Sequence, residues 1–174
     1  MDMSPWVAAL IAHGLLGGAD IILNHELIAH LPRQVAARRE LRLHSLRELA
    51  FALIFAGLAW YEWHGALAFV IIALFVSELW ISTVDTVLEL DTRRLPVTER
   101  ILHVLMFVNL GVVMALLGRD MVGWIAQPTA LVPARTGALA WVLSAQALLA
   151  LGWCIRDALS YRRLGQSAAA PAHC

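Results

Sequence analysis

Carboxylates and histidines recur at helical spacing within the most apolar parts of this chain. The stretch SELWISTVDTVLEL (residues 77–90) places four polar residues at offsets of 0, 4, 7 and 11, namely Glu78, Ser82, Asp85 and Glu89. An earlier apolar stretch repeats these offsets with His13, Gly17, Asp20 and Asn24. Residues at such offsets fall on one face of an α-helix. Each set therefore predicts a polar stripe along one side of an apolar helix.

Shorter pairs of acid and histidine have the same four-residue spacing. They are Glu40 with His44, His44 with Glu48, and Glu99 with His103. A further segment, HELIAH (residues 25–30), carries a histidine at each end. The spacing from Glu to His is one residue longer than in the Glu-x-x-His motif of ferritin-like di-iron proteins. The pattern therefore indicates related ligand chemistry without that motif.

Imidazole and carboxylate groups together suit iron, manganese or zinc, and helical bundles build metal centres from inward-facing Glu and His. We therefore predict a site for one or two metal ions, with iron favoured and zinc or manganese possible. The predicted ligands are His25, His44, His103, Asp20, Glu48, Asp85, Glu89 and Glu99. The residues predicted to support these ligands or to line a substrate pocket are His13, Asn24, His30, Glu40, Glu78 and Ser82.

The predicted ligands differ in how well their sequence context supports a functional role. Glu40, Glu48 and Glu99 each adjoin an arginine, so a solvated surface ion pair explains each of them equally well. Asp20 and Asp85 are embedded in apolar sequence without a neighbouring arginine. Ionisable groups inside a membrane span cost at least ~2.5 kcal/mol and normally mark a site, so these two favour a functional role.

The helices that carry these residues are predicted to cross a membrane. Of the 174 residues, 60% are hydrophobic and 15% are charged, whereas a soluble domain averages about half apolar and about a quarter charged. Five segments are long and apolar enough to span a bilayer, at about 5–27, 44–62, 65–90, 99–118 and 137–157. We expect an all-α, polytopic transmembrane bundle in which residues 1–164 form one domain, the first four spans surround the site, and residues 165–174 form a disordered tail.

The arginines predict the orientation of the bundle. All thirteen basic residues are arginine, and eleven of them lie in or beside the link after the first span, the link after the third span and the C-terminal end. Cytoplasmic links retain positive charge, which puts the N-terminus outside and the C-terminus in the cytoplasm. We expect an integral protein of a bacterial inner membrane.

The function that this pattern favours is a metal-dependent membrane oxidoreductase or hydroxylase. It would act on a lipid or another hydrophobic substrate at the cytoplasmic side, with an electron donor as a further partner. Three alternatives remain open: a haem- or quinone-linked electron-transfer protein with two axial histidines, a small transporter subunit or metal carrier, and a polar network that only holds the helices together. The net charge of zero excludes a nucleic-acid partner.

Overall fold

The structure is a computed structural model that describes the backbone of residues 4–169 and the side chains of residues 4–166. It is helical apart from two short strands, which confirms the all-α part of the predicted fold class. The main helices are α1 (Pro5–Asp20), α2 (Arg38–Trp60), α3 (Ala68–Thr92), α4 (Val97–Ile125) and α5 (Leu139–Ala169). A π-helix, η1 (Ile21–Ile28), continues α1 without a break, and short 3-10 turns, η2 (Leu31–Arg33) and η3 (Gly65–Leu67), precede α2 and α3.

Five helical segments within the described residues are long and apolar enough to cross a membrane, as predicted: Pro5–Ile28, Arg38–Trp60, Gly65–Thr92, Val97–Ile125 and Leu139–Gln166. Their ends differ from the predicted ones because a charged or glycine-rich helical turn does not look apolar in sequence. The second span begins at Arg38 instead of near residue 44, and the fourth continues to Ile125 instead of ending near residue 118. Helix α5 continues through Gly165 to Ala169, and residues 170–174 of the expected tail lie outside the described residues.

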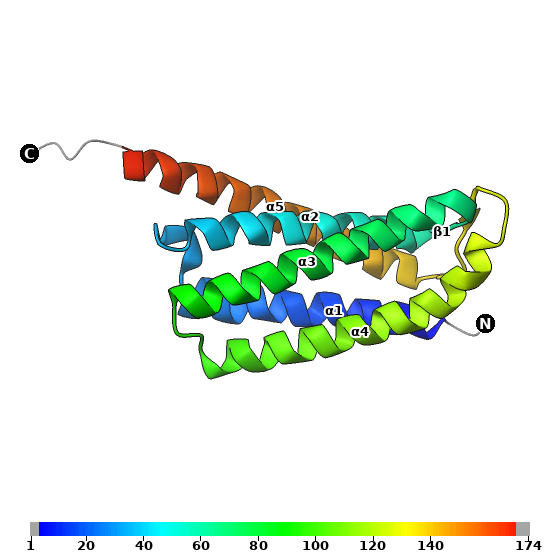
Figure 1. Cartoon of the computed structure of the whole chain (residues 1–174), viewed down its shortest axis with the longest axis horizontal. Helices are drawn as coiled ribbons and strands as arrows, with labels where there is room; N and C mark the ends of the chain where they lie inside the picture. The colour runs from blue at the N-terminus through cyan, green and yellow to red at the C-terminus, as the bar shows by residue number, and fades with distance from the viewer. Residues whose placement is uncertain (1–3, 170–174) are drawn as a thin grey trace, which may run out of the picture.

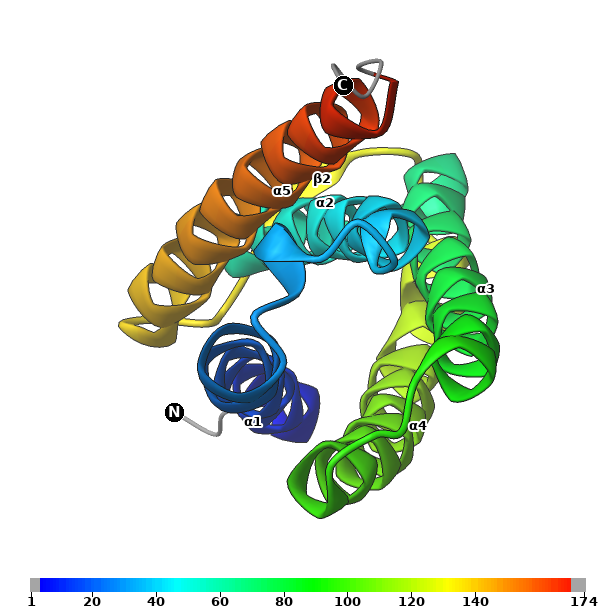
Figure 2. The ribbon, with the colours of Figure 1, turned by 90° about the vertical axis from the view of Figure 1, so that its left-hand side faces the viewer.

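The helices lie side by side along the long axis of the molecule (Figure 1). Viewed from one end, α1, α4, α3 and α2 follow one another around a central region, and α5 packs along the outside of α2 and reaches α1 (Figure 2). Large apolar side chains such as Trp80, Val122 and Leu148 point outward and are about 70% exposed. So apolar an outer surface fits a bundle that is surrounded by lipid.

The two ends of the bundle differ in character. One end, here called the arginine end, holds the link between α1 and α2, the link between α3 and α4, and the C-terminal part of α5 (Figure 1). There the guanidinium of Arg38 stacks on the ring of Tyr161 at 4.4 Å and its Nε donates to the Tyr161 carbonyl, which fastens α5 to α2.

The opposite end, here called the sheet end, is closed by two strands. Strand β1 (Tyr61–Trp63) pairs antiparallel with β2 (Leu131–Pro133), so the segment between α2 and α3 is joined to the long link after α4. The sequence indicates only a tight turn at YEWHG, because a pairing between segments 70 residues apart leaves no local periodicity. The strands fix the sheet end, from which the helices run to the site.

We predict that Gly65→Ala destabilises the sheet end. Gly65 has φ +57°, and a Cβ there would lie 2.7 Å from the backbone of Thr129. Left-handed backbone costs a non-glycine residue about 1–2 kcal/mol, and the overpacking adds about 1–3 kcal/mol. The melting temperature in detergent should fall clearly, whereas Gly111→Ala, with nothing within 4 Å of its added Cβ, should change it little. Equal melting temperatures for the two variants would contradict this account.

Candidate metal centre

The predicted polar stripes face the interior of the bundle. From Glu78 onward, all buried residues of α3 are polar: Glu78, Ser82, Asp85 and Glu89. The stripe on α1 is buried at His13, Asp20 and Asn24. Asp20, Glu89 and Glu99 are completely shielded from solvent, although each is a carboxylate near a helix end. The solvated ion pair that sequence context allowed for Glu99 is therefore not what the structure contains.

The π-helix after α1 explains how His25 joins this interior. Its wider turns bond each N–H to the carbonyl five residues back, as in the 2.7 Å bond from the Ala29 N–H to the Asn24 carbonyl. A residue at i+5 then lies closer to the face of residue i than it does in an α-helix, so Asp20 and His25 lie toward the same side. Their side chains approach to 3.5 Å, and His25 is only 2% exposed. The helix ends at Ile28, and the chain turns at His30, whose φ is +49°.

The first candidate ligand group contains His25, Glu89, Glu99 and His103. One ligand atom from each of these buried residues lies within 4.8 Å of the others, so the group could hold a metal ion. His25 Nε2 lies 3.4 Å from Glu99 Oε1, and His103 Nδ1 lies 3.5 Å from Glu89 Oε2. The ligands come from η1, α3 and α4.

The second candidate group contains Glu40, His44 and Glu89, which are also buried and close enough to hold an ion. His44 Nε2 lies 3.3 Å from Glu89 Oε1 and 3.0 Å from Asp85 Oδ2. The ring of His44 stacks in parallel on that of His25 at 4.4 Å. The two groups are therefore adjacent, and Glu89 belongs to both, with one oxygen facing His44 and the other facing His103.

Several atoms of these groups lack hydrogen bonds. Within the described residues, Asp20 Oδ2, His25 Nε2, Glu89 Oε2 and both ring nitrogens of His103 are buried without a hydrogen-bond partner. Buried polar atoms are normally paired, and an unpaired one costs about 1–3 kcal/mol. These atoms approach one another at 3.3–3.5 Å without making hydrogen bonds, and a cation among them would satisfy nitrogen and oxygen lone pairs together.

A chain of hydrogen bonds positions Asp20, which lies next to His103. Thr98 Oγ1 donates to Asn24 Oδ1 at 2.7 Å, and Asn24 Nδ2 donates to Asp20 Oδ1 at 2.7 Å. The other oxygen of Asp20 lies 3.3 Å from His103 Nε2. Metal-binding histidines usually direct their second nitrogen to a carboxylate in this way. The predicted supporting role of Asn24 therefore has a structural basis.

Two arginines that the sequence interpretation left as surface charges belong to this site. Arg47 Nη1 lies 3.4 Å from Asp85 Oδ2, and Arg47 is only 8% exposed. The guanidinium of Arg93 binds Glu99 Oε1 at 2.5 Å and Glu40 Oε1 at 2.7 Å. The helical spacing itself was a usable signal, because Arg47 follows Glu40 and His44 at offsets of 7 and 3, and Arg93 follows Glu89 at an offset of 4.

The ion pairs of Arg93 affect its titration. Burial disfavours the charged guanidinium, but the hydrogen bonds and ion pairs with Glu99 and Glu40 outweigh that effect and raise the pKa of Arg93 above its ordinary value. Arg93 is thus a fixed positive charge that bridges one acid from each candidate group. We call the two groups, with Asp20, Asp85, Arg47 and Arg93, the His/carboxylate layer.

The remaining predicted residues lie elsewhere. His30 is exposed beyond the end of η1 and belongs to neither candidate group. Glu48, predicted as a ligand, is buried but lines a cavity beside the layer instead of joining a group. Glu40, predicted only as a supporting residue, is a member of the second group. Glu40 and Glu48 lie eight residues apart on α2, which is about 12 Å along the helix axis, so they occupy different depths in the bundle.

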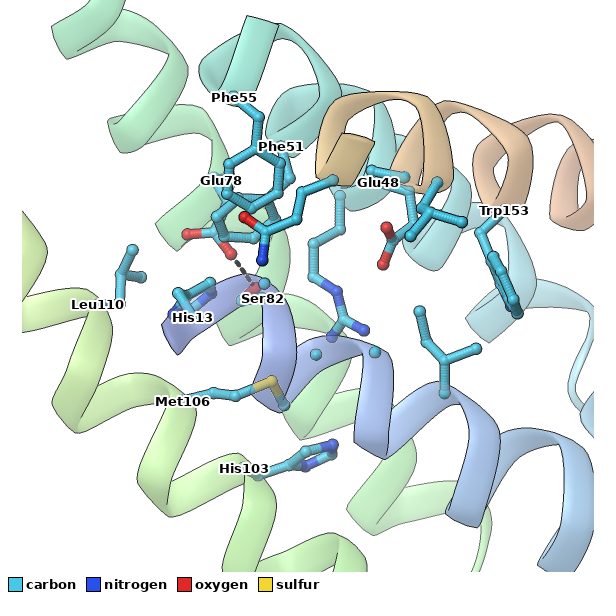
Figure 3. A pocket seen from close by; sticks show the side chains of 18 of the residues that line it. His13, Glu48, Phe51, Phe55, Glu78, Ser82, His103, Met106, Leu110 and Trp153 are labelled. Carbon is cyan, nitrogen blue, oxygen red and sulfur yellow. Dashed lines mark hydrogen bonds between the residues drawn. The ribbon is translucent and has the colours of Figure 1, made fainter. Parts of the chain in front are cut away.

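The cavity has a volume of about 200 Å³ and extends from the His/carboxylate layer toward the sheet end. Its walls are mostly apolar and include Phe51, Phe55 and Leu110, and His103 lies at its inner end (Figure 3). Glu78 lies on its wall and accepts a 2.6 Å hydrogen bond from Ser82. His13 does not pair with Glu78 but lies against Phe51, with ring centroids 4.6 Å apart.

Helix α5 contributes more than outer packing. Gln146, Leu149, Ala150 and Trp153 form one wall of the cavity. Nearer the arginine end, Arg156 pairs with Glu26 and with the buried Asp157. Gln146 is a polar residue within the fifth span, and its position on the cavity depends on how α5 crosses α1, which no local pattern encodes.

Comparisons of the chain with protein-family models, with curated proteins and with solved structures gave no match. The geometry of the site is therefore the basis for a functional proposal.

We predict that Arg47→Met destabilises the chelator-treated protein because it leaves Asp85 without its guanidinium partner. Removing one member of a buried ion pair costs about 3–5 kcal/mol. Arg42, exposed on the same helix, provides the matched control Arg42→Met, which should cost little. The measurement is the melting temperature in detergent. Adding Asp85→Leu to Arg47→Met should recover much of the loss, and an additive further loss would show that the pair is not coupled.

Proposed function

We propose that this chain is an integral membrane enzyme with a dinuclear metal centre in the His/carboxylate layer, most favourably of iron. In this proposal the centre oxidises or hydroxylates a lipid or another hydrophobic molecule that occupies the adjoining cavity. An external electron donor completes the reaction. The observation that carries the proposal is the position of Glu89, which belongs to two adjacent candidate groups and presents a different oxygen to each.

The ligand assignment follows the two groups. His25, Glu99 and His103 would hold one ion, Glu40 and His44 would hold the other, and Glu89 would bridge them. A bridging carboxylate flanked by histidines and terminal carboxylates is typical ligand chemistry for paired iron or manganese ions in helical bundles. Asp20 and Asp85 contact the histidines and would orient them or complete the coordination.

The charge of the layer also favours a pair of cations. It contains five carboxylates, Asp20, Glu40, Asp85, Glu89 and Glu99, and only two guanidinium groups. With all acids ionised, three negative charges remain uncompensated in a buried site. Unpaired buried charge is strongly destabilising, so protons or cations must be taken up. Two divalent ions would supply four positive charges. They would also bind the nitrogen and oxygen atoms of the layer that lack hydrogen-bond partners and lie close to one another.

The cavity connects this chemistry to an apolar substrate. His103 belongs to the first ligand group and also lies on the cavity wall, so a bound molecule would reach the edge of the metal centre. The residues of this chain would exclude water from that position and hold the substrate in place. The bound metal would supply the activation of oxygen, which protein side chains do not provide by themselves.

The alternatives have less support from the geometry. A haem between His25 and His44 would need space that their stacked rings, 4.4 Å apart, do not leave. A transit site for ions would need an open path, but the two groups are buried, and Arg93 covers them at the arginine end. We further propose that the arginine end faces the cytoplasm of a bacterial inner membrane, which the excess of arginine there supports.

We predict that purified protein contains two metal ions per chain and that Glu89→Gln reduces the content below one, because both ions lose a ligand. Inductively coupled plasma mass spectrometry after expression in iron-rich medium gives the content. Glu62→Gln changes a carboxylate at the sheet end that pairs with His64 instead, and it should retain both ions. Metal-free wild-type protein, or full metal content in Glu89→Gln, would overturn the proposed function.

The proposed orientation predicts which end reacts with an impermeant maleimide in intact cells. With both native cysteines replaced by serine, Leu131→Cys on β2 should be labelled from outside, since Leu131 is 47% exposed. Arg94→Cys, at an exposed position of the link between α3 and α4, should be labelled only after lysis. The reverse pattern would invert the proposed topology without affecting the proposed metal centre.

A further inference from the structure

The end of the cavity nearer the sheet end contains polar atoms that the metal centre does not use. His13 Nδ1, Glu78 Oε2 and Gln146 Oε1 have no hydrogen-bond partner within the described residues. They belong to α1, α3 and α5, and all three residues line the same cavity. His13 and Glu78 are only 5% and 1% exposed, so water outside the bundle does not reach them.

Each of these side chains is held in position by a second contact. Glu78 uses its other oxygen to accept the hydrogen bond from Ser82, and His13 lies against Phe51, as Figure 3 shows. Gln146 Nε2 donates to the Ile11 carbonyl at 2.9 Å and lies directly over Gly14, where an added Cβ would be only 2.6 Å away. The three unpaired atoms are therefore a fixed set.

Such a set requires a partner at this depth. An unpaired buried polar group costs about 1–3 kcal/mol, and hydrocarbon offers no water to relieve that cost. The carboxylate and amide oxygens accept hydrogen bonds, while the imidazole nitrogen accepts or donates according to its tautomer. The matching ligand group therefore donates a hydrogen bond and can also accept one, as a hydroxyl does.

The cavity also has an entrance from the lipid. Ile22 and Leu149 line it but are 49% and 61% exposed on the outer surface, so it opens at the seam between η1 and α5. Inside the seam, Gly17 and Gly18 leave space, since an added Cβ at Gly18 would meet nothing within 4 Å. At about 30 Å³ for a water-sized group, the cavity of about 200 Å³ holds roughly seven such groups. A longer alkyl chain would extend through the entrance into the lipid.

We propose that this cavity binds an apolar molecule bearing a hydroxyl group, which enters between η1 and α5 and hydrogen-bonds to Glu78 and His13. Its alkyl part lies along Gly17 and Gly18 and passes His103 at the edge of the layer. An ammonium group also donates hydrogen bonds, but a charge costs at least ~2.5 kcal/mol at mid-membrane, which favours the hydroxyl. As a statement about the substrate, this inference rests on the proposed function; as a binding site, it is measured independently.

The test uses tritiated 1-decanol bound to the purified protein in detergent, displaced by unlabelled 1-decanol, n-decane or decylamine. The wild type should prefer 1-decanol over n-decane by tenfold or more. Glu78→Leu and His13→Leu should each abolish that preference but still bind n-decane. Gly17→Leu should prevent binding of both ligands because its side chain fills the cavity. Glu62→Leu, at the sheet end, is the matched control and should bind as the wild type does.

Several results would overturn the inference. One is equal affinity of the wild type for 1-decanol and n-decane, which would leave water as the partner of the polar atoms. The others are tighter binding of decylamine than of 1-decanol, and an unchanged preference for 1-decanol in both folded variants. Melting temperatures identify any variant that fails to fold, and His13→Leu and Glu78→Leu test the site independently. Measuring metal-free and metal-loaded protein separates the two proposals. A preference for 1-decanol in a protein that contains no metal supports the hydroxyl site and rejects the proposed metal enzyme. Metal content without that preference supports the metal centre and rejects the hydroxyl site.

Discussion

Compensation of buried negative charge is the constraint on which the rest of this structure depends. Glu89 illustrates it, because one carboxylate on α3 contacts His44 from α2, His103 from α4 and, at 3.6 Å, Arg93 from the following link. In a hydrocarbon environment such contacts cannot be exchanged for water. The helices that carry acids must therefore approach the helices that carry histidine or arginine, and this requirement fixes their rotation. The same requirement is one reason why we propose that the layer binds cations.

On α2 and α4 the interior changes from polar to apolar within about two helical turns. Along α2 the buried face runs from His44 and Arg47 to Phe51, and along α4 it runs from His103 past Met106 to Leu110. Each helix thus contributes ligand chemistry at one depth and an apolar wall at the next. For this reason the candidate metal centre adjoins the cavity at His103, and the proposed substrate would not need a separate channel to reach the layer.

The sequence was sufficient for features that depend on local periodicity. The five apolar segments and the buried stripe from Glu78 to Glu89 are of this kind, because period and hydropathy are properties of one helix at a time. The ion pair between Arg93 and Glu40 could not be predicted from local periodicity, because the two residues are 53 positions apart and their pairing depends on how α2 packs against α3. Likewise, no apolar pattern distinguishes Glu40 from Glu48, or reveals the pairing of β1 with β2. Metal binding by the two candidate groups stays a prediction, which both the residue types and their geometry support.

The π-helical segment Ile21–Ile28 also bears on how this chain could change over evolutionary time. An α-helix advances by about 100° per residue, so an ordinary helix would turn His25 roughly 140° away from Asp20. Loss of one residue after His25, between Glu26 and Ile28, would let the backbone return to the commoner helix while the span stayed long enough for the bilayer. The length of the span would hardly change, but His25 would turn away from Asp20 and the interior. Membrane insertion and ligand placement are thus separately encoded in the first span, and a descendant could keep one and discard the other in a single step.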